Sequence, residues 1–170
     1  MDSLKITGLL RVYEFSSDEE QAEYANWWHR FSLAEKARKG RLVIEAHNLV
    51  TSAGRTQLLT FAGASGTTTA FAQYYAVGTG AIATVTAADT QLATELFRAV
   101  PSSSTVVGTT VTITTQFTTG QANGTYTNAG IFGVNATGTA NSGTLMTHIL
   151  YSYTKTSANA IYNDYTISLT

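Results

Sequence analysis

The stretch TVTITTQF, residues 110–117, is the part of the chain that decides its fold class. Its side chains alternate with a period of two, which is the period of a β-strand. One face of the strand would carry Val111, Ile113, Thr115 and Phe117, and the other Thr110, Thr112, Thr114 and Gln116. β-Branched residues also favour extended structure. We therefore predict a β-strand here.

Similar runs lie on both sides of this stretch. Aromatic and β-branched residues, separated by clusters of Gly, Asn, Ser and Thr, predict strands at residues 71–78, 95–100, 105–119, 124–134, 143–153 and 161–170. Residues 4–15 and 41–50 also alternate, and the mixed pattern of 4–15 indicates a strand covered on both faces. About eight short strands with irregular connections favour a mainly β fold, and we expect a jelly-roll-like antiparallel β-sandwich.

One helix is predicted over residues 17–39. Ser17 and Glu20 form an S-x-x-E capping box, acidic residues fill the first turn, and basic residues fill the last. Gly40 would end the helix in the left-handed conformation. A second short helix is expected after residue 50, capped by Thr51 or Ser52.

The first helix contains four aromatic residues, Tyr24, Trp27, Trp28 and Phe31. Tyr24, Phe31 and either Trp27 or Trp28 form a stripe at helical spacing. The two adjacent tryptophans would point about 100° apart, so one ring can face the sandwich while the other needs a second surface. Two alternatives remain: both rings pack in the core, or one ring anchors a partner. The second is considered because Trp is enriched at interface hot spots. These four residues are our candidates for partner binding.

Length and composition set the limits of the fold and function. A chain of 170 residues is expected to form one β-sandwich domain over residues 1–170, with residues 17–39 as a helical insertion. Only 12% of the residues are charged, sixteen of the 21 charged residues lie within residues 1–55, and none lies between Ala99 and Thr154. The surface must therefore consist mainly of hydroxyl, amide and small side chains.

These features argue against several classes of protein. The net charge of −1 and the absence of a Lys/Arg cluster argue against nucleic-acid binding. No apolar run is long enough to span a membrane, and acidic Asp2 does not suit a signal peptide, so we expect a soluble, unprocessed chain. The lack of cysteine excludes disulfides and thiolate chemistry.

The residues that could support catalysis are few. His29, His47 and His148 lack metal-ligand spacing, and we expect His148 to be a hydrogen-bonded strand residue rather than a metal ligand. Glycoside hydrolysis needs two carboxyl groups about 5 to 10 Å apart, and Glu95 and Asp164 are among the few acids of the strand region. We therefore predict no enzyme, no cofactor and no metal, and keep a glycan hydrolase as a third alternative.

Several motifs resemble small structural proteins of tailed bacteriophages, which occur as capsid decoration or cement proteins and as fibre-associated modules. The resemblance covers Gly40 to Thr170 and also includes the opening strand. It is carried by LKITGLLRVYEF, HNLVTSAGR, YYAVGTG followed by AADTQLATELFR, NGTYTNAGIFG and SGTLMTHILYSYTKT. The chain departs from this group at residues 17–39, where the group has a short turn between strands.

The resemblance implies architectural roles for particular residues. Asn48 and Gly54 would shape a corner, and Gly78 and Gly80 would form a turn. The cross-link under that turn would come from Asp89, Leu92, Glu95 and Arg98. We expect Glu95 or Asp89 to pair with Arg98 or Arg55, because few other charges are present.

The resemblance also implies a function. We expect a capsid cement protein that binds the outer surface of the phage head and bridges major capsid subunits, after synthesis in the host cytoplasm. Self-association as a dimer or a trimer is expected, since a thinly charged surface repels its copies weakly. The alternative is a head or tail fibre module that binds a host surface glycan, for which the strand tyrosines are candidate platforms.

Overall fold

The computed structural model of the protein describes residues 5–63 and 71–170. The elements follow one another as β1 (Ile6–Phe15), α1 (Asp18–Glu23), η1 (Trp28–Arg30), α2 (Leu33–Lys39), β2 (Arg41–Val50), α3 (Ser52–Gly63), β3 (Tyr74–Gly78), β4 (Glu95–Ala99), β5 (Ser103–Val107), β6 (Thr110–Phe117), β7 (Gly124–Gly133), β8 (Thr144–Lys155) and β9 (Ala160–Leu169). None of the described helices has the length and apolar character needed to cross a membrane.

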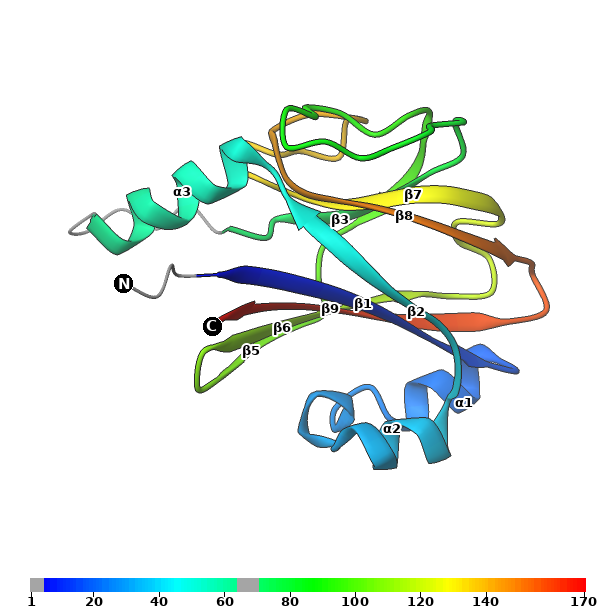
Figure 1. Ribbon diagram of the computed structural model, residues 1–170. Helices are drawn as coiled ribbons and strands as arrows, with labels where there is room; N and C mark the ends of the chain where they lie inside the picture. Colours follow the sequence, from blue (N-terminus) through cyan, green and yellow to red (C-terminus); the bar gives the residue numbers. More distant parts are fainter. Residues whose placement is uncertain (1–4, 64–70) are drawn as a thin grey trace.

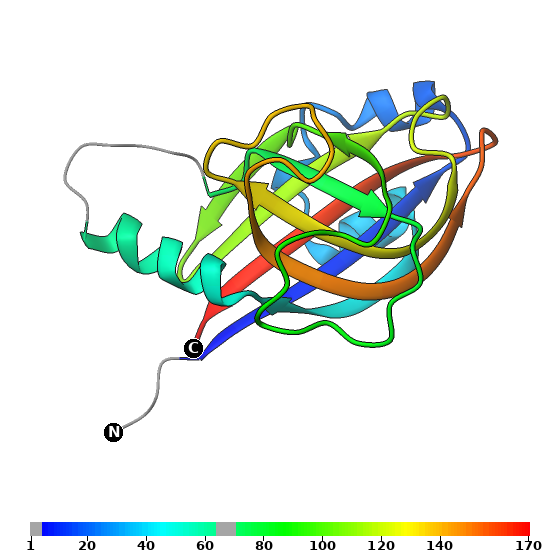
Figure 2. The ribbon, with the colours of Figure 1, turned by 90° about the horizontal axis from the view of Figure 1, so that it is seen from above.

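The nine strands within residues 5–63 and 71–170 form one antiparallel sheet in the order β4-β3-β7-β8-β2-β1-β9-β6-β5. The sheet curls so that β4, β3, β7 and β8 form an upper layer over β1, β9, β6 and β5, as Figures 1 and 2 show. Strand β2 belongs to both layers, because its residues 41–48 pair with β1 and its last two residues pair with β8. The prediction of a mainly β fold is confirmed, whereas a jelly-roll sandwich in particular is not confirmed.

The main core lies between the two layers. Ile113 and Phe117 of β6 are buried there with Leu10 and Val12 of β1, as the alternation of TVTITTQF predicted for β6. The upper layer contributes Tyr75, Val77, Ala129, Ile131, Met146 and Ile149 to the same cluster. Apolar residues of the two layers therefore meet in the space enclosed by the curl.

The helix predicted over residues 17–39 is wrong as one element. The structure forms α1, η1 and α2 instead, because a second capping box lies inside the segment. The Ser32 hydroxyl accepts from the Glu35 amide, the Glu35 carboxylate accepts from the Ser32 amide, and Ser32 itself is extended. An N-cap side chain competes with helical continuation. Ser17 does cap the first segment by accepting from the Glu20 amide, as predicted.

Gly40 ends α2 in an extended conformation (φ −119°, ψ 146°), so the predicted left-handed stop is also wrong. A Cβ at Gly40 would lie 2.6 Å from Cζ of Phe15. The glycine therefore makes room for an aromatic ring of β1. At the next corner, the hydroxyl of Thr51 accepts from the amide of Gly54 and caps α3, as expected from the sequence.

The helical insertion covers the outer face of the lower layer. Trp28 is only 1% exposed and packs with Tyr13, Phe15 and Tyr162, stacking on the Tyr162 ring at 4.6 Å between centroids. A buried carboxylate, Asp164 of β9, joins the insertion to the sheet. Lys36 Nζ lies 2.5 Å from Asp164 Oδ2, and the Trp28 indole N–H and the Thr114 hydroxyl donate to Oδ1 at 3.1 and 2.7 Å.

Candidate functional site

Four of the motifs that carry the resemblance meet on the outer face of the upper layer. Strand pairing places Arg98, Ala76, Gly130 and His148 in one row across β4, β3, β7 and β8. The two central residues, Ala76 and Gly130, are small, so the surface between Arg98 and His148 is low. We call this strip of the surface, over Ala76 and Gly130, the trough. Residues 79–94, the long connection between β3 and β4, lie over this layer at the top of Figure 1.

Leu92 anchors the 79–94 connection in the trough. Its buried side chain packs with Ala76, Phe132 and Leu145. A Cβ at Gly130 would lie 2.5 Å from a backbone oxygen of β8 and 3.3 Å from Cδ2 of Leu92. The glycine is therefore required first by the close approach of β8, and it also leaves room for the Leu92 side chain of the connection.

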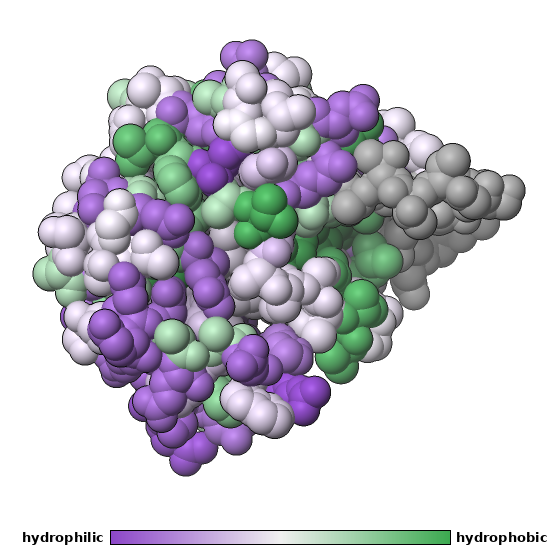
Figure 3. All heavy atoms as spheres, turned by 180° about the vertical axis from the view of Figure 1, so that it is seen from behind, coloured by the Kyte–Doolittle hydropathy of each residue, from purple (hydrophilic) through white to green (hydrophobic). Residues whose placement is uncertain are grey.

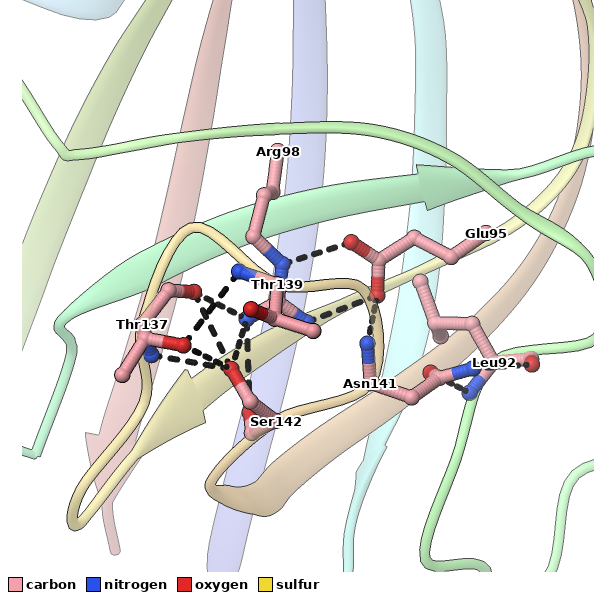
Figure 4. Close-up of polar contacts among 7 residues, drawn as sticks. All are labelled: Leu92, Glu95, Arg98, Thr137, Thr139, Asn141 and Ser142. Carbon is pink, nitrogen blue, oxygen red and sulfur yellow. Dashed lines mark hydrogen bonds and ion pairs between the residues drawn. The ribbon is translucent and has the colours of Figure 1, made fainter.

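Glu95 and Arg98 form a buried ion pair on one side of the trough (Figure 4). The guanidinium donates two N–H groups to the carboxylate, from Nε at 2.6 Å and from Nη2 at 2.7 Å. Residues three apart on a regular strand point to opposite faces. Here a bulge at Leu96 lets both charged side chains reach the outer face. The side chains of Glu95 and Arg98 are only 2% and 4% exposed.

The same ion pair fastens the loop of residues 134–143. Arg98 Nη1 donates to the carbonyl of Thr137 at 2.8 Å and to the hydroxyl of Ser142 at 3.1 Å. The Glu95 carboxylate accepts from the amide of Asn141 at 2.8 Å, and the Asn141 side chain accepts from the amide of Leu92 at 2.9 Å. Figure 4 shows these contacts as one network. Two connections that are far apart in sequence are thereby held together.

His148 and Asp89 form a hydrogen-bonded pair on the other side of the trough. His148 Nδ1 lies 2.6 Å from Asp89 Oδ2, and His148 Nε2 lies 3.4 Å from Asn128 Oδ1. The Asn128 amide nitrogen already donates to the carbonyl of Ala93 and the hydroxyl of Thr127. Its oxygen therefore faces the imidazole, so both ring nitrogens of His148 lie beside a polar partner.

The electrostatics of Asp89 follow from these contacts. Burial raises the pKa of Asp89, but hydrogen bonds from Thr86 and His148 outweigh burial and hold the pKa below its usual value. The carboxylate accepts from the Thr86 amide at 2.9 Å, as expected for a turn residue. The charged groups on both sides of the trough thus serve to hold backbone segments in place.

The structure brings together most of the residues expected to be architectural. Gly78 and Gly80 contact the backbone of Ala93, since a Cβ at either glycine would lie 2.6 or 2.7 Å from Ala93 backbone atoms. The expected pairing of Glu95 with Arg98 is present. Asp89 pairs with His148 instead of Arg98 or Arg55, because Arg55 lies exposed on α3.

Asn48 and Gly54 lie apart from the trough, near the corner between β2 and α3. The Asn48 side chain lies over Gly8, where a Cβ would be 1.6 Å from Asn48 Oδ1. A Cβ at Gly54 would be 2.1 Å from the carbonyl oxygen of Met146, so α3 packs directly on the backbone of β8. Both residues are thus in contact with elements that form the corner.

The candidate partner-binding residues separate into two groups. Trp28 faces the sheet, as expected for one of the two adjacent tryptophans: its ring stacks on Tyr162 and its indole N–H donates to Asp164. Tyr24 and Phe31 are half-buried against the same aromatic cluster. Trp27 is 54% exposed, and the Arg30 guanidinium lies 4.9 Å from its ring centroid.

Sequence reasoning missed Asn128, Asn141 and Ser142, which supply acceptors and donors to the Glu95–Arg98 and Asp89–His148 pairs. Their only sequence signal is their place beside the motif glycines. It also missed the link between Lys36 and Asp164, which are 128 residues apart. Strand register and the path of the insertion create these contacts, and neither is encoded in local spacing.

Glu95 and Asp164 do not form the carboxylate pair that a glycan hydrolase would need. Glu95 lies on the outer face of the upper layer and pairs with Arg98, whereas Asp164 lies under the insertion on the outer face of the lower layer. Within residues 5–63 and 71–170, no group of three or more His, Asp or Glu side chains is arranged to hold a metal ion.

The chain was compared with protein-family models, curated proteins and solved structures, and none of the three comparisons found a match. The likeness to phage structural proteins therefore depends on the motifs themselves.

Proposed function

We propose that this protein is a structural component of a tailed-phage virion. In this proposal it binds the outer surface of the head as a cement protein, bridges major capsid subunits, and acts as a dimer or a trimer. The protein would stabilise the shell mechanically, without contacting the packaged DNA. A jelly-roll-like arrangement of the strands is part of the same proposal.

The observation that carries the proposal is the convergence of the resemblance motifs. Four of them, VGTG, AADTQLATELFR, TNAGIFG and LMTHIL, come from different parts of the chain. Leu92, Gly130 and His148 come together at the trough on the upper layer, and Gly78 lies beside them against the backbone of Ala93. Motifs that shared only composition with the phage group would not be expected to form one packed arrangement.

The distribution of charge also supports a structural role. The few charged side chains after residue 55 make contacts inside the molecule: Arg98 pairs with Glu95, Asp164 pairs with Lys36, and Asp89 bonds to the His148 ring. The exposed residues of the 79–94 connection are instead small or uncharged, among them Ala81, Ala83, Thr84, Ala88, Thr90 and Gln91. Such residues can be buried against a neighbouring protein without the cost of desolvating charge.

Trp27 is the side chain that best suits a contact with the shell. It lies on the helical insertion, where the chain departs from the phage group, and Leu33 of the same insertion is 55% exposed. Figure 3 shows strongly hydrophilic residues gathered over the lower part of the molecule, on the side of this insertion. An exposed indole within polar surroundings is typical of an interface anchor.

The test uses DNA-free shells of the phage that encodes this chain. The purified protein is expected to cosediment with the shells and to raise their melting temperature. Trp27→Ala should keep the fold and weaken shell binding about tenfold or more, the loss of a hot spot of at least ~1.4 kcal/mol.

The matched control is Leu59→Ala, which removes an exposed apolar side chain from α3. This variant should bind shells like the unaltered protein. Failure of the unaltered protein to bind the shells would contradict the proposed function. An equal loss of shell binding in Trp27→Ala and Leu59→Ala would contradict the role of Trp27 as the shell contact.

A further inference from the structure

A groove of about 590 Å³ crosses the outer face of the lower layer beside the helical insertion. Two cross-strand rows form its floor: Thr7, Ser168 and Thr110 in one, and Leu9, Thr166 and Thr112 in the other. Leu33 of α2 lies on its wall. The groove is lined by Lys5, Thr7, Gly8, Leu9, Arg11, Leu33, His47, Thr110, Thr112, Thr166 and Ser168, and we call it the sheet groove.

The sheet groove is rich in hydrogen-bond donors. Arg11 uses Nε to contact Glu45 at 2.7 Å, and its two terminal nitrogens make no hydrogen bond within the part of the chain that the structure describes. Within the described residues, the Lys5 ammonium and the hydroxyls of Thr7 and Thr112 also make no hydrogen bond. The described lining includes no acidic side chain.

These groups define the chemistry of a ligand. Guanidinium and ammonium donors bind carboxylates through charge-assisted hydrogen bonds. Rows of Thr and Ser hydroxyls can exchange hydrogen bonds with other hydroxyls, and Leu9 and Leu33 offer apolar contact to C–H groups. A ligand that suits all three features carries carboxylates, hydroxyls and C–H faces together.

We propose that the sheet groove binds a linear acidic polysaccharide whose sugar units carry carboxylates. Lys5 and Arg11 lie at opposite ends of the groove, with the Thr and Ser rows between them. The carboxylates of successive sugar units would contact these two cations, and sugar hydroxyls would contact the Thr and Ser rows. This binding site is separate from the shell contact at Trp27 and goes beyond the proposed cement function.

The sheet itself argues against a peptide as the occupant. Strands β1, β9 and β6 each have a hydrogen-bonded neighbour on both sides. A peptide lying on them could not join the sheet by strand addition, which is how extended peptides usually satisfy their backbone groups. A saccharide has no such backbone, since its polar groups are hydroxyls and carboxylates that side chains can reach.

The experiment measures binding of galacturonic-acid oligomers by calorimetry, with maltose oligomers of equal length as the neutral comparison. We expect the acidic oligomer to bind at least ten times more tightly. Arg11→Gln and Lys5→Gln should each weaken binding several-fold to tenfold, and Thr112→Val should weaken it without changing net charge. None of these side chains contributes to the buried core, so the variants should melt like the unaltered protein.

Arg55→Gln is the control for charge, because it removes an exposed cation on α3. Thr84→Val is the control for a hydroxyl on the 79–94 connection. Both controls should bind the acidic oligomer normally. No binding, an equal loss in Arg55→Gln and Arg11→Gln, or tighter binding of polyglutamate than of the galacturonic-acid oligomer would overturn the proposal. The shell assay is independent, because it responds to Trp27→Ala and should not respond to Arg11→Gln.

Discussion

Replacing Arg98 with Met should destabilise the protein strongly, because it leaves a carboxylate buried without its cation. The Glu95 side chain is 2% exposed, so water cannot replace the two guanidinium N–H groups that it loses. Removing one partner of a buried ion pair costs about 3–5 kcal/mol. Since domains are typically stable by about 5–15 kcal/mol, this is a large part of the total.

A second substitution tests the cause of that loss. In the double variant Glu95→Gln with Arg98→Met, no charge remains buried, and the Gln oxygen can still accept from the amide of Asn141. We expect the double variant to lose only about 1–2 kcal/mol, since a neutral hydrogen bond contributes about 1 kcal/mol. The double variant should therefore be more stable than Arg98→Met alone.

Urea unfolding followed by tryptophan fluorescence measures these differences, because buried Trp28 becomes exposed when the chain unfolds. The control is Arg41→Met, which breaks the pair of Arg41 with Glu14, where the Arg41 side chain is 72% exposed. An exposed pair contributes about 0–1 kcal/mol. The reasoning is refuted if Arg98→Met costs no more than Arg41→Met, or if Glu95→Gln fails to recover stability.

Three further predictions concern the helical insertion, the Asp89 pair and the corner at α3. Trp28→Ala should cost about 3–5 kcal/mol, as for other large core truncations, whereas Trp27→Ala should change the unfolding free energy by less than about 0.5 kcal/mol; thermal and urea melts compare them. The pKa of Asp89 is lower in the folded protein than in the unfolded chain. Its contribution to stability is therefore present above the unfolded pKa and is lost as the pH falls through the folded pKa. In urea melts at a series of pH values, Asp89→Asn should make this loss of stability at acid pH smaller. Gly54→Ala should cost about 1–3 kcal/mol or more through overpacking on the β8 backbone, whereas Gly120→Ala should be well tolerated, since nothing lies within 4 Å of its added Cβ; differential scanning calorimetry separates the two.

Local patterns in the sequence were sufficient to predict most of the strands. The alternation around Ile113 places that residue in the core, and the cap at Ser17 begins a helix as expected. The same patterns failed within residues 17–39. The helical spacing of the aromatic residues favoured one continuous helix, although Ser32 caps a second one. The packing of Trp28 on the sheet is a tertiary contact that local sequence does not predict.

The candidate site was predictable only in part. Scarcity of charge made the pairing of Glu95 with Arg98 a reasonable expectation, although the bulge that permits it could not be foreseen. The pairing of Asp89 with His148 joins residues 59 positions apart. It depends on the register of β7 against β8 and on the path of the 79–94 connection, which local composition does not determine.

The position of β1 has a consequence for synthesis on the ribosome. This first strand pairs on one side with β2 and on the other with β9, so that Ile6 lies opposite Leu169. During translation one edge of β1 stays unpaired until β9 has been synthesised. Such long sequence separation slows folding, and an open strand edge promotes aggregation. We therefore expect newly made chains to depend on chaperones until β9 has left the ribosome and paired with β1.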